Sequence, residues 1–283
     1  MVNSNFPEQH QAPPGKEWEM NPKPVYDDPN QKGSGKLLNK VAVVTGGDSG
    51  IGRAVAVAFA KEGADVVIAY LKADNDAAET RTAVENYGRR CITVCADLRE
   101  ESSAFRVVDE TLSSLGKIDI LVNNIAVQYP QNSISDISAQ QLDDTFRTNV
   151  FSYFYMTKAA LPHLKAGSCI INTTSITAYK GNAELIDYSA TKGAIVSLTR
   201  SLSVSVLKNG IRVNAVAPGP VWTPLIPSTF SPEKVGEFGS SVPVQYAAQP
   251  VQLAPTYVYL ASDDASYVSG QVLHVNGGVI VDS

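Results

Sequence analysis

Tyr188 and Lys192 form the pair of residues in this sequence that is best suited to acid–base chemistry. Residues 187–208 carry apolar side chains at helical spacing, so positions four apart share one face of a predicted helix. Tyrosine, with an ordinary pKa of about 10, is a poor base at neutral pH, and a nearby ammonium group favours the phenolate. The alternative is structural, because a tyrosine on the core and a lysine at the surface are common on helices.

A second hydroxyl and a glycine-rich loop stand at other predicted strand ends. Ser175 follows the apolar run 168–173, thirteen residues before Tyr188. The sequence TGGDSGIG, residues 45–52, lies between a strand-like run and a helical run. Glycines allow a tight turn close to a pyrophosphate, and the amides at a helix N-terminus attract its charge. A plain strand-to-helix turn can also use glycine, but the flanking elements favour a dinucleotide site.

Alternating elements must position these residues. Short β-branched runs predict strands over 41–45, 65–70, 91–96, 118–122, 168–173, 211–215 and 271–275, and apolar periodicity predicts helices over 52–62, 75–87, 101–115 and 187–208. We therefore predict an α/β fold, a doubly wound, Rossmann-like parallel sheet of about seven strands with helices on both faces. Residues 38–283 would form this single domain, with function at the carboxyl ends of the strands.

The first 37 residues differ from the rest in composition. They contain six prolines and three glycines and show hardly any periodic apolar pattern. This composition predicts an extended arm. Four apolar residues suggest that the arm lies on its own or a neighbouring subunit, while a flexible tail is the alternative: Trp18, Met20, Val25 and Tyr26.

Composition excludes several classes of partner. The net charge is −5 and no basic run follows a phosphate backbone, so we expect no nucleic-acid partner. The apolar stretches are strand-sized, and no apolar segment follows the N-terminus, so we expect no membrane span and a cytoplasmic protein. Cys91, Cys95 and Cys169 lie in strand-like runs, which predicts buried, reduced thiols and no metal site.

Over residues 38–278 the chain resembles the short-chain dehydrogenases/reductases. The resemblance rests on motifs in that family's order and approximate spacing: TGGDSGIG, the pair Asn123-Asn124, Asn149, Ser175, Tyr188 with Lys192, PGPVWT at 218–223, LASDDASYVSG at 260–270 and NGG at 276–278. It implies an enzyme in which Ser175 holds the substrate oxygen and Tyr188 exchanges a proton with it. Lys192 would lower the Tyr188 pKa and bind the nicotinamide ribose, and Asn149 would hold a water linking Lys192 to solvent.

The resemblance also implies how a nicotinamide cofactor would be bound and supply the hydride. Besides Tyr188 and Lys192, the expected contacts are Gly46, Asp48, Ser49, Gly50, Ile51, Gly52, Tyr70, Asp97, Leu98, Asn123, Ile125, Ala126, Pro218, Gly219, Val221 and Thr223. The family usually has Ala-Gly where Ile125-Ala126 stands, and we expect only a small adjustment there.

The choice between NAD and NADP depends on the end of the second strand. No acidic residue stands at Tyr70 to bond the ribose hydroxyls, and no arginine stands there to receive a 2′-phosphate. Asp48 disfavours an extra phosphate, while Lys72 and Arg53 favour one. We expect NAD over NADP.

The sequence defines the substrate less well than it defines the cofactor. Residues 224–244 would form the substrate lid, and the arm, with GGDSGIGR and APGPVWTPL, resembles a bacterial subgroup described as glucose or ribitol dehydrogenase-like or as aldehyde reductases. We expect interconversion of an alcohol or polyol and the corresponding carbonyl, with a small alcohol, polyol or aldehyde as substrate, in a homotetramer. The alternatives are a non-catalytic NAD-binding sensor or scaffold, and a lyase or epimerase that uses the cofactor transiently.

Overall fold

The computed structural model describes residues 6–281 and contains a parallel sheet with the strand order β3-β2-β1-β4-β5-β6-β7. The seven strands are β1 (Val41–Thr45), β2 (Asp65–Tyr70), β3 (Cys91–Cys95), β4 (Ile120–Asn123), β5 (Cys169–Thr173), β6 (Arg212–Pro218) and β7 (Val272–Val275). Every neighbouring pair is parallel. The predicted doubly wound sheet is confirmed, and its order reverses between β1 and β4, where such sheets bind ligands.

Two strands differ from their predicted bounds by more than one residue. β4 begins at Ile120 rather than at 118, because the side chain of Asp119 accepts a hydrogen bond from the Val41 amide at 2.8 Å and makes the start of the pairing irregular. β6 continues to Pro218 rather than ending at 215, because β7 pairs with it as far as Pro218. Sequence patterns miss such shifts because they depend on the neighbouring strand.

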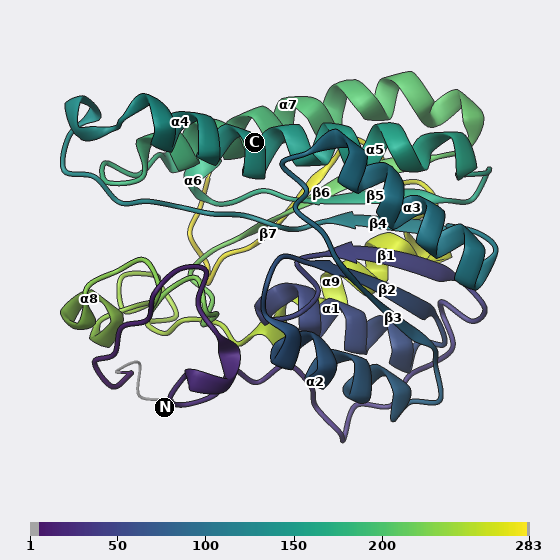
Figure 1. Ribbon diagram of the computed structural model, residues 1–283, viewed down its shortest axis with the longest axis horizontal. Helices are drawn as coiled ribbons and strands as arrows, with labels where there is room; N and C mark the ends of the chain where they lie inside the picture. The colour runs from purple at the N-terminus through teal and green to yellow at the C-terminus, as the bar shows by residue number, and fades with distance from the viewer. Residues whose placement is uncertain (1–5, 282–283) are drawn as a thin grey trace.

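Helices cover both faces of the sheet (Figure 1). One face carries α1 (Gly50–Lys61), α2 (Asp74–Glu85) and α9 (Ala254–Ala261), and the other carries α3 (Glu101–Leu115), α4 (Ala139–Phe146), α5 (Ser152–Ala160) and α7 (Ile186–Val206). Two short helices, α6 (Thr177–Lys180) and α8 (Pro232–Gly236), follow β5 and β6. The sequence patterns predicted α1, α2, α3 and α7 only.

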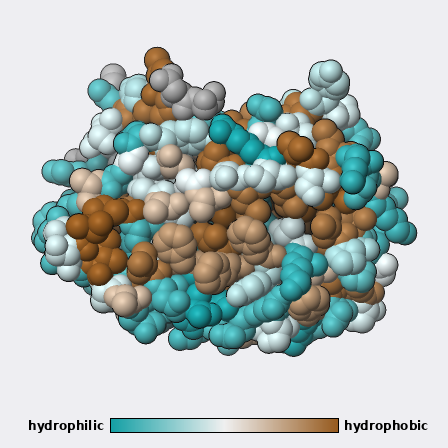
Figure 2. Space-filling view, turned by 90° about the horizontal axis from the view of Figure 1, so that it is seen from above, coloured by the Kyte–Doolittle hydropathy of each residue, from teal (hydrophilic) through white to brown (hydrophobic). Residues whose placement is uncertain are grey.

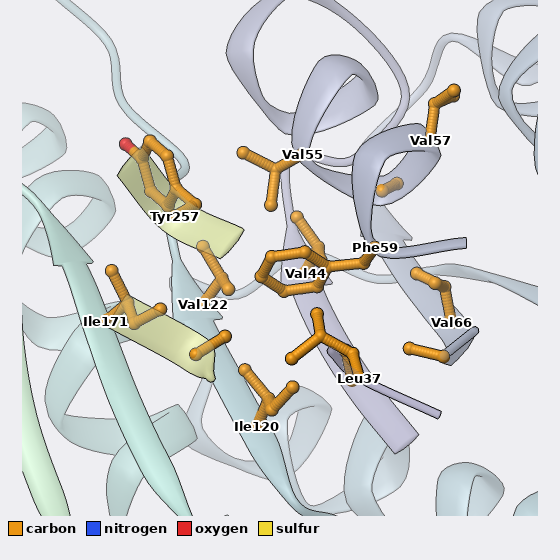
Figure 3. Packing of buried hydrophobic residues seen from close by; sticks show 14 of the residues in the cluster. Leu37, Val44, Val55, Val57, Phe59, Val66, Ile120, Val122, Ile171 and Tyr257 are labelled. Atoms are coloured by element: carbon orange, nitrogen blue, oxygen red, sulfur yellow. The ribbon is translucent and has the colours of Figure 1, made fainter. Parts of the chain in front are cut away.

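The core is split between the two faces of the sheet. On the α1 side, Phe59 packs beside Val44 and Val122, with Leu37 and Ile120 below them in the view of Figure 3. On the other side, residues of α3 and α5 pack on the alternate residues of the same strands. Burying one such side chain stabilises the fold by about 1.5–3 kcal/mol, which explains why these strands have almost no polar face.

The described part of the arm lies on its own chain, next to the segment that contains α8 (Figure 1). Met20 is buried in a small cluster with Trp222, and Glu17–Glu19 form a single helical turn. Val25, expected to be covered, is 47% exposed. Residues 1–5 of the predicted arm are outside the described residues.

None of the helices formed by residues 6–281 combines the length and apolarity needed to cross a membrane.

Candidate active site

Ser175 lies at the carboxyl edge of the sheet, just after β5, and is almost completely buried. Its hydroxyl oxygen accepts hydrogen bonds from the amide and the hydroxyl of Thr177, each 3.1 Å long. These contacts fix Ser175 at the start of α6. The central position of β5, between β4 and β6, explains why a residue that follows it reaches this edge.

Tyr188 lies in the first turn of α7, where Asp187 fixes the backbone. One carboxylate oxygen of Asp187 accepts the Tyr188 amide at 2.9 Å. The other accepts the Thr145 hydroxyl at 2.9 Å and the Gln141 side-chain amide at 3.0 Å. Asp187 therefore joins α4 to the start of α7. Asp187 was not predicted as a site residue. Its only signal in the sequence is an acidic side chain directly before the tyrosine, and its burial is seen only in the structure.

Lys192 is buried one turn after Tyr188, which excludes the alternative of a surface lysine. Its ammonium nitrogen donates to the carbonyl oxygen of Thr173 at 2.9 Å and lies 5.5 Å from the centroid of the Tyr188 ring. The ring of Tyr153 lies 5.7 Å from the same nitrogen. Lys192 thus connects α7 to the end of β5, beside Tyr188 and Ser175.

Burial shifts the pKa values of both residues in the direction that disfavours the charged form. Burial raises the pKa of Tyr188 to about 12, and the side chain of Ser175 opposes this rise. Burial lowers the pKa of Lys192 to about 7. Burial is therefore the largest influence on the pKa of Tyr188 in this structure, and the expectation that Lys192 lowers this pKa stays a prediction.

Asn149 lies in a π-helical turn, Arg147–Phe151, between α4 and α5. Its side chain accepts the Val127 amide and donates to the Val127 carbonyl, both at 2.8 Å, and donates to the Thr191 hydroxyl at 3.1 Å. π turns inside helices are frequent at functional sites. The side chain of Asn149 thus holds the loop after β4 against α7, next to Lys192.

The glycine loop meets β4 and the segment after β6. A Cβ atom at Gly52 would lie 1.9 Å from the Gly46 carbonyl oxygen, so no other residue fits at this point. A Cβ atom at Gly46 would lie 3.2 Å from the Ile125 side chain, and one at Gly50 would lie 3.0 Å from Thr223. Three segments that the sequence motifs singled out therefore converge at one end of α1.

The first turn of α1 presents free amides to this convergence point. The Gly50 amide donates to the side chain of Glu17, and the first bond inside the helix runs from the Arg53 amide to the Ser49 carbonyl. Among residues 6–281, no acceptor binds the amides of Ile51 and Gly52. Free amides and a glycine cradle fit the pyrophosphate of a dinucleotide.

The residues expected near the adenosine differ in whether a side chain or only the main chain is available to a ligand. The Tyr70 hydroxyl donates to Asp74 at 2.7 Å, and burial, together with this bond, raises the pKa of Tyr70 to about 12. Asp97 is held by the Arg99 guanidinium, whose hydrogen bonds keep the pKa of Asp97 below its usual value. The Leu98 side chain is buried in the core, so only its main chain is available to a ligand. Burial raises the pKa of Asp48 to about 6.

Of the two asparagines after β4, Asn124 and not Asn123 has a side chain at the crevice. The Asn123 side chain is fully buried and donates to Asn172 at 3.0 Å, so only the main chain of Asn123 is available for the predicted cofactor contact. The Asn124 side chain donates to the Thr45 carbonyl at 3.2 Å and accepts from the Thr173 hydroxyl at 3.2 Å. Asn124 thus ties together the ends of β1, β4 and β5.

The segment from Pro218 to Thr223 continues β6 across the site. Gly219 lies close to Asn276: a Cβ atom added to Gly219 would lie 2.7 Å from the Cα atom of Asn276. Val221 is buried and Thr223 is partly exposed beside the glycine loop. Ala126, which replaces the family's glycine, is partly exposed and has no positive φ, so its methyl group causes no backbone strain.

The cysteines form no site within residues 6–281. Cys91 and Cys169 are buried free thiols, while Cys95 is exposed, contrary to the expectation that all three are buried. No group of three or more His, Cys, Asp or Glu residues in this part of the chain could hold a metal ion.

Comparisons with known proteins identify the relatives of this chain. The sequence profile of the family described as enoyl-(acyl carrier protein) reductase matches residues 46–280. The chain is 53% identical to a glucose and ribitol dehydrogenase of Daucus carota, over 98% of this chain and 97% of that protein. It is 50% identical to NADPH-dependent aldehyde reductase 1, chloroplastic, of Arabidopsis thaliana, over 96% of this chain and 97% of that protein.

Solved structures show the same fold with cofactors bound. A short chain dehydrogenase from Burkholderia cenocepacia J2315 in complex with NADP is 30% identical, with a TM-score of 0.80, over 86% of this chain and 98% of that chain. A 3-ketoacyl-(acyl-carrier-protein) reductase from Brucella melitensis complexed with NADH is 33% identical, with a TM-score of 0.79 and the same coverage. The chain belongs to the short-chain dehydrogenase/reductase family of NAD(P)-dependent oxidoreductases.

Proposed function

We propose that the protein interconverts an alcohol or polyol and the corresponding carbonyl compound, with Tyr188 as the general acid and base. The observation that carries this proposal is the burial of Tyr188 and Lys192 together, beside Ser175, at the carboxyl end of β5. Burying a lysine without a carboxylate partner costs stability, so a functional reason for keeping it is needed.

In carbonyl reduction, Ser175 would donate a hydrogen bond to the carbonyl oxygen and hold it next to Tyr188. The bound cofactor supplies the hydride to the carbonyl carbon. Tyr188 would donate its hydroxyl proton to the oxygen as negative charge develops there. Oxidation of the alcohol would use the same contacts in reverse, with Tyr188 accepting the proton.

Lys192 and Asn149 would return the proton to Tyr188. A group with a pKa of about 7 can both give and accept a proton near neutral pH, which suits Lys192 as the next member of a relay. The side-chain amide of Asn149 is used by Val127 and Thr191, so its part in the relay is to fix the turn beside Lys192. A water held at this turn would complete the path to solvent.

NAD is our proposed preferred cofactor. The Arg53 guanidinium, a candidate for a 2′-phosphate, is surrounded by Glu17, Asp76 and Glu79 and is not free to turn. Lys72 is the exposed cation that stays available near the end of β2. Titrating the purified protein with both cofactors tests this preference, and tenfold tighter binding of NADP would overturn it.

The substrate class follows from the relatives and from polar groups near the proposed lid, residues 224–244. The carrot relative is described as a glucose and ribitol dehydrogenase and the Arabidopsis relative as an aldehyde reductase. Gln128, which follows β4, donates to the lid residue Thr229 at 3.4 Å, so hydrogen-bonding groups lie where the lid meets the β4 loop. We therefore propose sugars, polyols and small aldehydes as the first substrates to assay.

The Tyr188→Phe variant tests the mechanism. We expect a loss of turnover of about 10²–10⁴-fold, because the proton donor is removed, while the cofactor binds as in the wild type. Tyr179→Phe is the matched control, because the Tyr179 hydroxyl has no hydrogen-bond partner among residues 6–281. Unchanged turnover in Tyr188→Phe would refute the assignment. Turnover without net change in nicotinamide absorbance would instead favour a lyase or epimerase.

A homotetramer is the proposed assembly. Apolar side chains gather on the face that carries α4, α5 and α7 (Figure 2). The exposed apolar residues of these helices and the turns that join them include Leu142, Phe151, Phe154, Val204 and Leu207. Contiguous exposed apolar surface is typical of interfaces. A monomer in light-scattering measurements would contradict this proposal.

The cytoplasm is the proposed compartment. Cys91, Cys95 and Cys169 are free thiols, which fits a reducing environment. Fractionation of cells that express the protein would test this assignment.

A further inference from the structure

The N-terminal arm reaches the glycine loop through the buried side chain of Glu17. Glu17, in the helical turn of the arm, accepts the Gly50 amide hydrogen bond at 2.6 Å. Only 2% of its side chain is exposed. Gly50 is the first residue of α1. Its φ of +53° lies in the left-handed region, so the chain changes direction here, where the loop ends and the helix begins. Glu17 leaves the next amides, those of Ile51 and Gly52, for the cofactor.

The Glu17 carboxylate also contacts the glycine loop indirectly, through Arg53. Its second oxygen pairs with the Arg53 guanidinium at 2.7 Å. Arg53 in turn donates two hydrogen bonds, 2.8 and 3.0 Å long, to the main-chain carbonyl oxygen of Asp48. The backbone amide of Glu17 donates to Asp76 of α2 at 2.9 Å. The arm is therefore connected to both ends of the segment 48–50, directly at Gly50 and through Arg53 at Asp48.

Other arm residues anchor this contact to the segment after β6. Phe6 stacks on Trp222 with ring centroids 3.8 Å apart, and the Trp222 indole donates to the Pro22 carbonyl at 2.9 Å. The Gln11 amide donates to the Pro227 carbonyl at 2.9 Å. The arm thus spans the glycine loop and the lid on one molecule.

We propose that Glu17 is a positioning residue of the cofactor site, through which the arm holds the glycine loop in the conformation that binds the pyrophosphate. This inference rests on the proposed cofactor contacts of the loop. Glu17 acts through Gly50 and Arg53 and does not touch the reacting atoms. Without Glu17, Gly50 loses its acceptor and Arg53 loses one carboxylate partner, although Asp76 and Glu79 still hold its guanidinium. The segment 48–50 is then fixed at fewer points.

A purely structural role accounts poorly for a carboxylate at this position. Burial raises the pKa of Glu17 to about 7, against the attraction of Arg53 and the Gly50 amide, so the fold keeps the acid where burial disfavours its charge. Replacing a whole buried ion pair by well-packed apolar residues is often neutral for stability, so stability alone does not require a buried acid here. The acid is therefore retained for its two directed contacts on the loop.

Glu17→Gln tests the proposal in the full chain, with Glu19→Gln as the matched control. Glu19 lies in the same helical turn, but its side chain is 43% exposed and pairs with Lys16. Glutamine keeps an oxygen that can accept the Gly50 amide but turns an NH2 donor toward Arg53, so this variant removes the Arg53 contact. We expect the KM and Kd of the cofactor to rise about fivefold or more, a magnitude typical of coupling between sites, while kcat at saturating cofactor stays within about twofold. Hydrogen exchange of residues 46–52 should increase in the same variant.

The outcomes separate this inference from the proposed function. If wild type and Glu19→Gln bind the cofactor and Glu17→Gln binds it equally or more tightly, the positioning role is refuted and the enzyme assignment stands. If wild type itself binds no nicotinamide cofactor, the proposed function fails first. Should Glu17→Gln not fold, Glu17→Met, whose apolar side chain has a similar length, replaces it, and unchanged cofactor affinity in that variant is equally decisive.

Discussion

Replacing Lys192 by methionine should make the stability of the protein less dependent on pH. Burial lowers the pKa of Lys192 to about 7, whereas an unfolded lysine has a pKa of about 10.4. Between these values the unfolded chain binds one proton more than the folded chain at this position. The free energy of unfolding therefore rises with pH in this range, by at most about 1.4 kcal/mol per pH unit from this residue.

The expected difference is large enough to measure. From pH 7.5 to 9.5 the contribution of Lys192 amounts to roughly 2–3 kcal/mol, and Lys192→Met lacks it. Methionine has a similar length and suits the aromatic surroundings of Tyr153 and Tyr188, so we expect the variant to fold. Turnover should be lost, because the relay loses its ionisable group.

Urea unfolding at both pH values, at one fixed protein concentration, is the appropriate assay. Other groups titrate equally in the two proteins, so the difference between wild type and variant isolates Lys192. If that difference is the same at pH 7.5 and 9.5, the Lys192 pKa is not lowered by burial, and the reasoning about the relay is refuted.

Three further changes test other parts of the structure. Gly52→Ala should destabilise the protein by about 1–3 kcal/mol and abolish cofactor binding in a fluorescence titration, because its methyl group overlaps the Gly46 carbonyl. Wild-type binding would contradict the predicted cradle. Trp222→Ala should lower the free energy of unfolding by about 3–5 kcal/mol and expose the arm to proteases, since Phe6 loses its stacking partner. Maleimide should label only Cys95 in the native protein, as the other thiols are buried, and mass spectrometry would detect further labelling.

The fold was predictable because the seven strands and the helices α1, α2, α3 and α7 have strong local patterns. The strands β1, β2 and β5 are buried on both faces, and this produces the continuous apolar runs from which a parallel sheet was inferred. The doubly wound arrangement of the sheet followed from right-handed crossovers. The helix α5 was missed, because its exposed aromatic residue Phe154 obscures the amphipathic pattern of the buried face.

The candidate site was predictable as a set of residues, but not as a set of contacts. Ser175 and the glycine loop lie at strand ends, which topology alone brings to one edge. The sequence could not show that Asn123 turns into the core while Asn124 faces the crevice, because both follow the same strand. The contact of Glu17 with Gly50 joins residues 33 positions apart and depends on the path of an arm without periodic structure.

The least predictable feature is the protonation state of the catalytic pair, and it determines how turnover depends on pH. With a Tyr188 pKa of about 12 the hydroxyl stays protonated at physiological pH, ready for carbonyl reduction. Lys192, with a pKa of about 7, holds a proton to replenish Tyr188 below that pH and can accept one above it. We therefore expect kcat for alcohol oxidation to rise as pH increases through 7, and kcat for carbonyl reduction to fall.

Measuring kcat in both directions between pH 6 and 9, at saturating cofactor, tests this expectation. The Lys192→Arg variant is the control: its arginine keeps its charge throughout this range, so turnover should be low, and the residual turnover should show no inflection near pH 7. Parallel pH profiles in the two directions, or an inflection that persists in Lys192→Arg, would show that another group carries the proton. The opposite slopes follow from one relay used in two directions, since the lysine must be charged to supply a proton and neutral to receive one.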